Sequence, residues 1–433
     1  MRQKAVLVIG GGIAGIQASI DLANMGIKVY LVEKKPSIGG RMAQLDKTFP
    51  TNDCSMCILA PKMIECANHS NIELLTYSEL AELKGKPGKF KAKVIKKARF
   101  VEENKCVGCG DCAEKCPTKA DDEFNTGLGK RKAIYKYFPQ AVPSTYVIDP
   151  DHCRTMQGKK CGVCEKICKA KAVNYGQKEK VLSLNIGAVV LATGFDLYDV
   201  APLKEYGWGS IKNVITAMQF ERMICASGPT GGHLKRPSDD EEPKRLAFIQ
   251  CVGSRDIRHK RYCSAVCCMH ATKEAILARE HYPALTSTIF YMDMRAAGKG
   301  FQEYVRRAKS QYAVEYVRAR PGRVTENEEN NNPVIHYEDT IHRVFEAREF
   351  DMVILCQALI PSESNLSIAE NLSIELDEFG FISTPQELIN PFGTTREGIF
   401  GCGFCQSPMD VPDSVIRASA AASKVAEVMA HVS

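Results

Sequence analysis

Short apolar runs that alternate with helical patterns organise the start of the chain. The stretch KAVLVIGGGIAGIQASIDLANMGIKVYLVEKK begins with a continuous apolar strand, AVLVI. A segment follows whose apolar positions recur at helical spacing through Leu22, and then a second strand, KVYLVE, ends at Glu33. Strands that are apolar throughout are typical of parallel sheets covered on both faces. The pattern therefore predicts a βαβ unit.

Comparable patterns recur later in the chain. NIGAVVLATGFDLYD and RLAFIQ each predict a further buried strand, and LTSTIFYMDM predicts a later strand of the same sheet as RLAFIQ. The segment DVPDSVIRASAAASKVAEVMAHV predicts a final amphipathic helix with Asp413 as its N-cap. These elements predict an α/β fold class with two dinucleotide-type domains.

Glycines at the first strand–helix junction favour a dinucleotide site. Gly10, Gly12 and Gly15 form the pattern G-x-G-x-x-G. The first allows a tight turn, the second lets the backbone approach a pyrophosphate, and the third lets helix and strand pack closely. Glu33, at the end of the second strand, lies where an acid accepts hydrogen bonds from ribose hydroxyls.

Later residues indicate FAD rather than NAD. The loop PSIGGRMAQ resembles the FAD-binding half of two-dinucleotide-domain flavoproteins such as thioredoxin reductase, and the strand ending at Ala192 resembles their closing element. In such flavoproteins the acid before the final helix holds the ribityl chain, which corresponds to Asp410 here. The predicted FAD-binding residues are Gly10, Gly12, Ala14, Gly15, Glu33, Lys34, Gly39, Gly40, Arg41, Thr193, Gly194, Asp410 and Ser414.

Nineteen cysteines, many at short spacings, indicate metal or redox chemistry. CVGCGDCAEKCP has the C-x2-C-x2-C-x3-C-P spacing of bacterial ferredoxins, and a second run lies in CRTMQGKKCGVCEKICK. In such pairs the last cysteine of each run binds the other cluster. One predicted 4Fe–4S set is Cys106, Cys109, Cys112 and Cys168, and the other is Cys153, Cys161, Cys164 and Cys116. A zinc ribbon, which uses only two C-x2-C pairs, explains the eight cysteines less well.

A third group of cysteines stands where a second nucleotide loop is expected. After RLAFIQ comes CVGSRD, with Gly253 alone, and then the helical segment CSAVCCMHATKEA. The spacing of Cys251, Cys263, Cys267 and Cys268 leaves three readings open: a cluster, buried structural thiols, or a redox disulfide. The second domain therefore lacks its nicotinamide fingerprint.

Two C-x2-C pairs remain open in function. Cys54 and Cys57 could be a redox dithiol, cluster ligands or inert thiols, and Cys402 and Cys405 could pack against FAD or act in redox chemistry. Cys66, Cys225 and Cys356 are expected to be buried small residues.

Composition narrows the class of protein. No apolar run approaches the roughly 18–20 residues that span a bilayer, and no secretory signal is evident, so a cytoplasmic chain is predicted. The formal charge is +6, but each cluster with four thiolates contributes about −2, and three clusters would bring the charge near zero. No basic stripe with interleaved aromatics indicates nucleic-acid binding.

Long motifs give the chain a specific resemblance. SGPTGGHLKRPSDDEEPKRLAFIQCVGSRD, YCSAVCCMHATKEA and CQSPMDVPDSVIRASAAASKVA resemble the A subunit of heterodisulfide reductase, which carries flavin and iron–sulfur clusters. The resemblance predicts a short form, without the extra N-terminal domain and C-terminal ferredoxin of longer members. The A subunit of the quinone-interacting membrane-bound oxidoreductase and subunits of benzoyl-coenzyme A reductase complexes are also similar.

The resemblance implies an oxidoreductase subunit that exchanges electrons between FAD, 4Fe–4S clusters and partner subunits. It favours a third cluster on Cys251, Cys263, Cys267 and Cys268, and implies that Lys273 lies beside the flavin ring. Electron bifurcation and a dimer of complexes stay open. The alternative is a stand-alone NAD(P)H-dependent disulfide reductase that uses Cys54 and Cys57.

The expected domains follow from these motifs. They are an FAD-binding domain in three parts, an inserted ferredoxin domain and a degenerate NAD(P)-like domain. The FAD-binding parts are 1–100, 179–243 (with a linker) and 361–433; the insert is 101–178, and the degenerate domain is 244–360.

Overall fold

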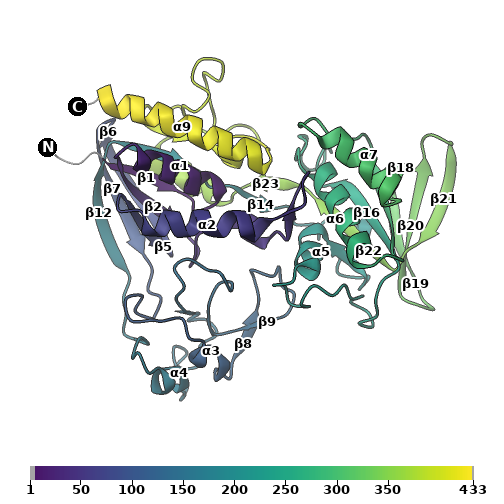
Figure 1. Ribbon diagram of the computed structural model, residues 1–433, viewed down its shortest axis with the longest axis horizontal. Helices are drawn as coiled ribbons and strands as arrows, with labels where there is room; N and C mark the ends of the chain where they lie inside the picture. The colour runs from purple at the N-terminus through teal and green to yellow at the C-terminus, as the bar shows by residue number, and fades with distance from the viewer. Residues whose placement is uncertain (1–4, 432–433) are drawn as a thin grey trace. The chain divides into compact units, whose positions relative to one another are not determined.

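A computed structural model describes residues 5–431 and divides the chain into two compact units. The first unit comprises Met1–Ala43, Met56–Phe195 and Pro361–Ser433, and the second comprises Gln44–Ser55 and Asp196–Ile360. Figure 1 shows the elements of both units. No helix within residues 5–431 combines the length and the apolar character needed to cross a bilayer.

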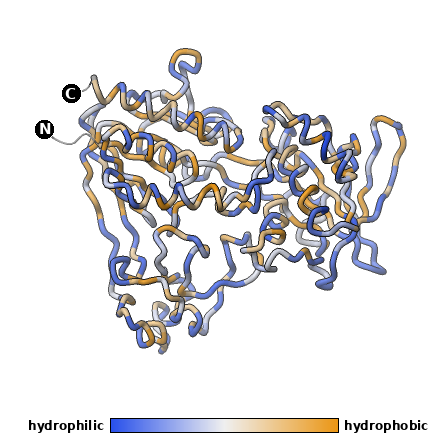
Figure 2. The backbone as a smooth tube through the Cα atoms, in the orientation of Figure 1, coloured by the Kyte–Doolittle hydropathy of each residue, from blue (hydrophilic) through white to orange (hydrophobic). Residues whose placement is uncertain are grey.

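A five-stranded parallel sheet forms the centre of the first unit, with the strand order β24-β13-β1-β2-β5. Its strands are β1 (Ala5–Ile9), β2 (Lys28–Glu33), β5 (Ile72–Thr76), β13 (Ala188–Leu191) and β24 (Ile399–Gly401). Helices α1 (Ile13–Asn24), α2 (Ser55–Asn68) and α9 (Val411–His431) accompany it, and α1 and α9 lie side by side (Figure 1). Figure 2 shows mixed hydrophobic and hydrophilic colour along α1 and α9, as expected for helices that bury one face.

A smaller antiparallel sheet, β12-β7-β6, packs on the same core. It consists of β6 (Ser78–Lys86), β7 (Lys89–Lys96) and β12 (Lys180–Ile186), and helix α8 (Ser364–Leu372) packs against β6. Side chains of β7 alternate between buried and exposed, which is typical of an antiparallel strand with one solvated face.

The cysteine-rich insert lies between β7 and β12 and spans residues 97–179. Its elements are α3 (Asp111–Glu114), β8 (Lys119–Asp121), β9 (Lys130–Lys132), β10 (Ile134–Tyr135), β11 (Val147–Ile148) and α4 (Val163–Ile167). The stretch between the two cysteine runs contains two short strand pairs, β8–β9 and β10–β11.

The second unit contains its own five-stranded parallel sheet, β15-β22-β16-β17-β18. The strands are β15 (Val214–Thr216), β16 (Arg245–Val252), β17 (Thr286–Tyr291), β18 (Glu315–Arg318) and β22 (Met352–Gln357). The helices are α5 (Ala217–Ile224), α6 (Cys267–His281) and α7 (Phe301–Gln311), and β19 (Arg323–Asn327), β20 (Asn332–Asp339) and β21 (Val344–Glu349) form an antiparallel sheet.

The remaining short elements, taken over both units, are η1 (Gly40–Gln44), β3 (Lys47–Thr48), β4 (Asp53–Cys54), β14 (Phe195–Leu197), η2 (Lys204–Tyr206), β23 (Leu359–Pro361) and η3 (Gly403–Cys405).

The observed units differ from the expected domains in two places. Residues 196–243 were expected in the FAD-binding domain and its linker, but β15 pairs with β22 and so belongs to the second sheet. Residues 44–55 also belong to the second unit, although they follow the glycine loop in sequence.

A buried arginine ties the insert to the first unit. Arg99 is 1% exposed, and its guanidinium donates to the carbonyl of Pro36 and to Thr76 Oγ1, each at 2.6 Å. Its Nε lies 3.1 Å from Glu103 Oε1, and its own carbonyl accepts from the amide of Ile148. One residue therefore connects strand ends of the sheet with two segments of the insert.

Replacing Arg99 with methionine is expected to lower the free energy of unfolding by about 3 kcal/mol, because buried acceptors lose their donor. Lys97→Met is the control, since the Lys97–Glu79 ion pair is exposed and should contribute less than about 0.5 kcal/mol. Urea denaturation of both variants measures the difference, and equal losses would contradict the anchoring role of Arg99.

Candidate functional site

The turn between β1 and α1 is built for close backbone approach. A Cβ at Gly10, whose φ is +110°, would lie 2.2 Å from the carbonyl oxygen of Ala192, and one at Gly15 would lie 1.8 Å from the Gly10 oxygen. Gly12 is the N-cap and carries no side chain, and the first turn of α1 contains no acidic residue. The amide groups at this helix end can therefore donate to a phosphate group.

Glu33 closes one side of this turn. It is 8% exposed, and its carboxylate accepts hydrogen bonds from the amides of Gly11 and Lys35, each at 2.7 Å. Burial raises its pKa, whereas the two amides oppose that shift. The carboxylate is thus held in place with acceptor capacity left for ribose hydroxyls. Lys34, next to it, lies 3.5 Å from Ser362 Oγ.

The second glycine loop lies directly against the first. The amide of Gly39 donates to the carbonyl of Gly11 at 2.7 Å, and a Cβ at Gly40 would lie 2.7 Å from the Cα of Gly12. Arg41 Nε donates to the carbonyl of Phe195 at 3.4 Å. Side chains larger than hydrogen at Gly12 and Gly40 would fill this cradle, which fits an extended dinucleotide.

The C-terminal segment of the first unit reaches the same region. A Cβ at Gly403 would lie 2.8 Å from Ala14 Cβ and 3.9 Å from the Ser414 side chain, so α1, η3 and α9 converge. The Asp410 carboxylate accepts the amide of Asp413 at 2.9 Å. Asp410, not the expected Asp413, therefore caps α9, because Asp413 already lies inside the helix.

Thr193 completes this set of predicted residues. It follows β13, and its hydroxyl donates to Asn365 Oδ1 at 2.6 Å, while Gly194 has a φ of +69°. The structure thus brings the predicted FAD-binding residues together from five segments of one unit.

The insert brings one predicted cluster set together directly. Cys116, Cys153, Cys161 and Cys164 line a single cavity, although Cys116 comes from the other cysteine run. The hydroxyl of Tyr175 lies 2.9 Å from Cys164 Sγ. The last cysteine of the first run therefore lies with the first three of the second run.

The other predicted set surrounds Cys112. Burial raises the pKa of Cys112 to about 12, and the neighbouring thiols of Cys106, Cys164 and Cys109 add to that shift. Cys168 packs in the same apolar cluster, and its sulfur accepts the amide of Ala172 at 3.3 Å. Cys112 is buried, Cys106 and Cys168 are half-buried and Cys109 is exposed. Thiols that repel one another as anions form a donor set suited to bound iron.

The cysteines of the second unit converge at the end of β16. Cys267 forms hydrogen bonds with both Cys251 and Cys268, and the thiols of Cys251 and Cys268 influence Cys263 electrostatically. The hydrogen bond from Cys267 and the guanidinium of Arg255 lower the pKa of Cys251 to about 7. A low pKa favours the thiolate, which is the form that binds metals.

Backbone geometry around these thiols is strained. Cys251, Arg255 and Ala265 have φ values of +59°, +54° and +63°, in a region that costs non-glycine residues free energy. The amide of Ala265 donates to Cys263 Sγ at 3.4 Å, and that of Arg295 donates to Cys268 Sγ at 3.5 Å. Such strain and N–H···S bonds are expected where a backbone is shaped to hold thiolates.

No three thiols of the described residues lie close enough together to surround a single ion. Within residues 5–431, three ligand atoms from His, Cys, Asp or Glu come within 4.8 Å of one another only in the group Glu221, His270 and Glu274.

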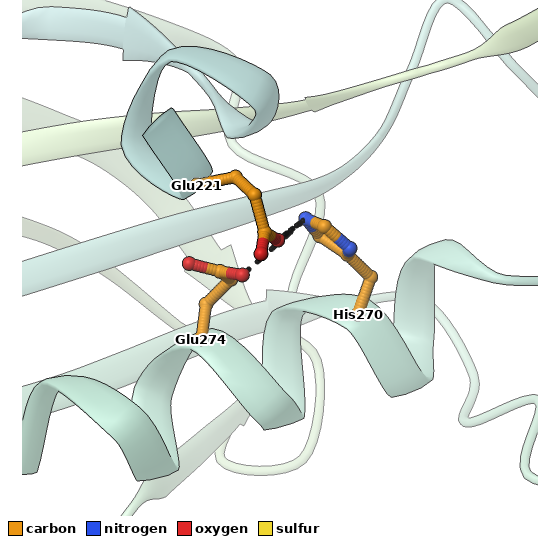
Figure 3. Close-up of side chains that lie close together, drawn as sticks. All are labelled: Glu221, His270 and Glu274. Atoms are coloured by element: carbon orange, nitrogen blue, oxygen red, sulfur yellow. Dashed lines mark ion pairs between the residues drawn. The ribbon is translucent and has the colours of Figure 1, made fainter. Parts of the chain in front are cut away.

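Figure 3 shows how the side chains of Glu221, His270 and Glu274 lie, and a cation, Lys273, also contacts this group. The Lys273 ammonium donates to Glu221 Oε2 at 2.6 Å and lies 3.0 Å from Glu274 Oε1, and both carboxylates are completely buried. It also donates to the carbonyl of Lys47 at 3.0 Å. A metal ion is not needed for charge balance here, because Lys273 bridges the two acids.

The two carboxylates that contact Lys273 differ in their pKa. Burial would raise the pKa of Glu221, but Lys273 outweighs it and the pKa falls to about 2. Burial and the charge of Glu221 raise the pKa of Glu274 well above its usual value. Glu221 is thus the anion that pairs with Lys273, and the predicted role of Lys273 beside a flavin stays a prediction.

The other cysteines have distinct surroundings. Cys54 and Cys57 are exposed and are not free thiols, whereas Cys402 and Cys405 are completely buried thiols. Burial raises the pKa of Cys405 to about 11, and its thiol donates to the carbonyls of Leu191 and Cys402.

Cys356 is a neighbour of the Cys251 group that sequence reasoning missed. It lies on β22, 2% exposed, and the thiols of Cys251 and Cys268 add to the effect of burial in raising its pKa. Only the pairing of β22 with β16 reveals this proximity, because Cys356 is isolated in sequence.

Two family models match segments of the chain. Residues 5–53 match the family model "FAD dependent oxidoreductase", and residues 100–121 match "4Fe-4S binding domain". Thioredoxin reductases from Lactococcus lactis and T. acidophilum have the same fold, each with a TM-score of 0.53 and 13% identity, over 99% of this chain and 99% and 98% of theirs. These likenesses confirm the predicted two-dinucleotide-domain fold with an iron–sulfur insert.

Curated relatives match at much higher identity. The iron–sulfur A subunit of the CoB–CoM heterodisulfide reductase of Methanocaldococcus jannaschii is 49% identical over 99% of this chain. One of the corresponding A subunits of Methanopyrus kandleri is 51% identical over 98%, and the A subunit of the H(2):CoB-CoM heterodisulfide,ferredoxin reductase of Methanothermobacter marburgensis is 46% identical over 97%. The chain spans 63–64% of the length of these relatives.

Two glycine substitutions separate folding from flavin binding. Gly15→Ala should destabilise the first unit by about 3 kcal/mol or more, because its Cβ would overlap a carbonyl oxygen. Gly12→Ala should cost no more than about 1 kcal/mol, since its nearest neighbour lies 4.0 Å away, yet the new methyl group fills the cradle. We expect this variant to fold with at least about tenfold less flavin, as measured by thermal denaturation and flavin absorbance. A full flavin content in the Gly12→Ala variant would contradict the assignment of this turn as the flavin-binding site.

Removing the Lys273 ammonium, which bridges Glu221 and Glu274, should destabilise the second unit. Lys273→Met leaves the Glu221 carboxylate buried without its partner, which should cost about 3–5 kcal/mol. Adding Glu221→Gln should restore part of that loss, because the unpaired charge is removed. Lys299→Met, at an exposed lysine, is the control. Denaturation curves with no recovery in the double variant would argue against the ion pair as the cause.

Proposed function

Since the chain belongs to the family of heterodisulfide reductase A subunits over the length that it spans, we propose that it is an electron-transfer oxidoreductase subunit of a heterodisulfide-reductase-like complex. It holds FAD in the first unit and three 4Fe–4S clusters, two in the insert and one at the end of β16. When bound, FAD couples two-electron to one-electron chemistry, and the clusters carry single electrons.

One observation carries the proposal. In the second unit, four thiols converge where a nicotinamide-binding domain would have its glycine-rich loop. The first unit retains the dinucleotide cradle, and the second has cysteines in place of the equivalent loop. A chain organised in this way is suited to exchange single electrons rather than hydride.

The protein contributes positioning and electrostatics. Amides at the start of α1 would bind the pyrophosphate, Glu33 would bind the ribose, and Asp410 and Ser414 would lie along the ribityl chain. Arg255 would place a positive charge beside the cluster at Cys251, where Asp293 holds the guanidinium through an ion pair. Positive charge near a cluster favours its reduced state.

Other subunits are the proposed partners. The relatives are named as the A subunits of heterodisulfide reductases, and one name adds ferredoxin. We therefore propose partner subunits that carry out the disulfide chemistry and a ferredoxin-type protein that exchanges electrons with the chain. A stand-alone NAD(P)H-dependent disulfide reductase is less well supported, because the second unit lacks a nicotinamide loop and the relatives are subunits.

Iron counting tests the third cluster. The anaerobically purified chain should contain about twelve iron atoms, four for each cluster. Cys263→Ser should retain about eight, whereas Cys66→Ala, at a buried thiol remote in sequence from these groups, should keep all twelve. Eight iron atoms in the unmodified chain would rule out the proposed cluster at Cys251. Flavin bleaching by NADH alone would favour the alternative function.

A further inference from the structure

Strand β16 buries a polar side chain directly beside the thiols at its end. Every residue from 246 to 252 is buried, and among these only Gln250 carries an amide side chain. Gln250 is 5% exposed, whereas strands of a parallel sheet that are covered on both faces are usually apolar throughout. A buried amide needs hydrogen-bond partners for both its oxygen and its NH2 group. Gln250 is therefore unfavourable here unless the site supplies those partners.

The structure supplies a partner for only one end of this amide. Oε1 of Gln250 accepts a hydrogen bond from the thiol of Cys268 at 3.1 Å, and Cys268 itself is 2% exposed. Nε2 of Gln250 is buried and has no hydrogen-bond partner within residues 5–431. An NH2 group left unpaired away from water costs the folded chain free energy. The amide that contacts Cys268 thus carries a buried donor that the described residues leave unpaired.

Loss of the thiol proton of Cys268 reverses what this amide must provide. A cysteine binds a metal as the thiolate, which accepts hydrogen bonds and has no proton to donate. Oε1 of Gln250 would then face a sulfur without a proton between the two acceptors. A half turn about the last torsion of the glutamine side chain exchanges the places of Oε1 and Nε2. Nε2 can then donate to the sulfur, and the unpaired donor gains its partner.

We infer that Gln250 is a positioning residue for Cys268 and donates a hydrogen bond from Nε2 to the Cys268 sulfur when a 4Fe–4S cluster is bound. The inference rests on the proposed third cluster and adds a residue to that site. Cys268 directly follows Cys267 in α6, and side chains of adjacent helical residues do not face the same way. A donor on β16 fixes the position of this ligand sulfur from the side of the sheet.

This hydrogen bond would also raise the reduction potential of the cluster. Reduction adds negative charge to the cluster and its ligands, and N–H donors stabilise that charge more strongly than they stabilise the oxidised state. The amide of Arg295 already donates to Cys268 Sγ at 3.5 Å. Gln250 adds a second donor to the same sulfur, so one electron enters this cluster more readily and the amide keeps its proton.

The variant Gln250→Leu tests the inference, since leucine fills the site without an N–H group. The matched control is Gln357→Leu: Gln357 is 8% exposed on the neighbouring strand β22, but its Nε2 donates to the carbonyl of Tyr198 at 2.9 Å. In a redox titration followed by EPR, Gln250→Leu should shift the equilibrium of this cluster about tenfold toward the oxidised state, which equals a fall of about 59 mV for one electron. Gln357→Leu should leave the potential unchanged.

The signal of this cluster is identified by its absence from Cys263→Ser, the variant expected to lack it. An unchanged potential in Gln250→Leu, or an equal fall in Gln357→Leu, would overturn the role of Gln250.

A second measurement needs no substitution at Gln250, and it decides the question if Gln250→Leu loses its cluster. The unmodified chain, labelled with ¹⁵N in its glutamine side chains and reduced, should show coupling between ¹⁵N and this cluster in pulsed EPR. The coupling should be absent from Cys263→Ser and retained in Gln357→Leu. No coupling in a chain with about twelve iron atoms would overturn the inference, whereas about eight would overturn the proposed cluster and this role with it.

Discussion

Buried parallel strands must end in turns that satisfy the hydrogen bonding of their backbone groups. This constraint positions the candidate functional residues of both units. At the end of β1, a Cβ at Gly10 would lie 2.2 Å from the carbonyl oxygen of Ala192, so only glycine fits. At the end of β16 the chain leaves its register between Ile249 and Val252, and Cys251 adopts a positive φ there. The same position in two similar frames thus yields a phosphate cradle in one and a thiol group in the other.

The charged and hydrogen-bonding groups of the two units also differ, in line with these two kinds of site. In the first unit, uncapped amides and a buried carboxylate suit a ligand with phosphates and hydroxyl groups. In the second unit, Arg255 and two N–H···S hydrogen bonds suit thiolates. Lys273, which pairs with Glu221 of α5, lies on the same helix that begins with Cys267, so that helix carries both a thiol and the cation of a buried ion pair.

Local patterns in the sequence predicted much of this organisation, and tertiary contacts account for what they missed. The glycine turn and the ferredoxin spacings are local, because each depends on residues within about one or two turns of chain. Cys356 joins the Cys251 group only because β22 pairs with β16. The Arg99 contacts join residues far apart in sequence, and the placement of residues 196–243 in the second sheet depends on a strand pairing of the same kind. The cap of α9 at Asp410 depended on where the helix begins, which patterns predict least well.

The placement of the insert has an evolutionary consequence. Strands β7 and β12 are antiparallel neighbours, with Lys96 directly opposite Lys180, so the entire insert occupies the position of a hairpin loop. The entropic cost of closing a loop grows only slowly with its length, and adding residues there leaves the ladder of the sheet intact. A flavoprotein ancestor could therefore acquire a ready-made iron–sulfur module by a single insertion, without redesigning its nucleotide-binding core.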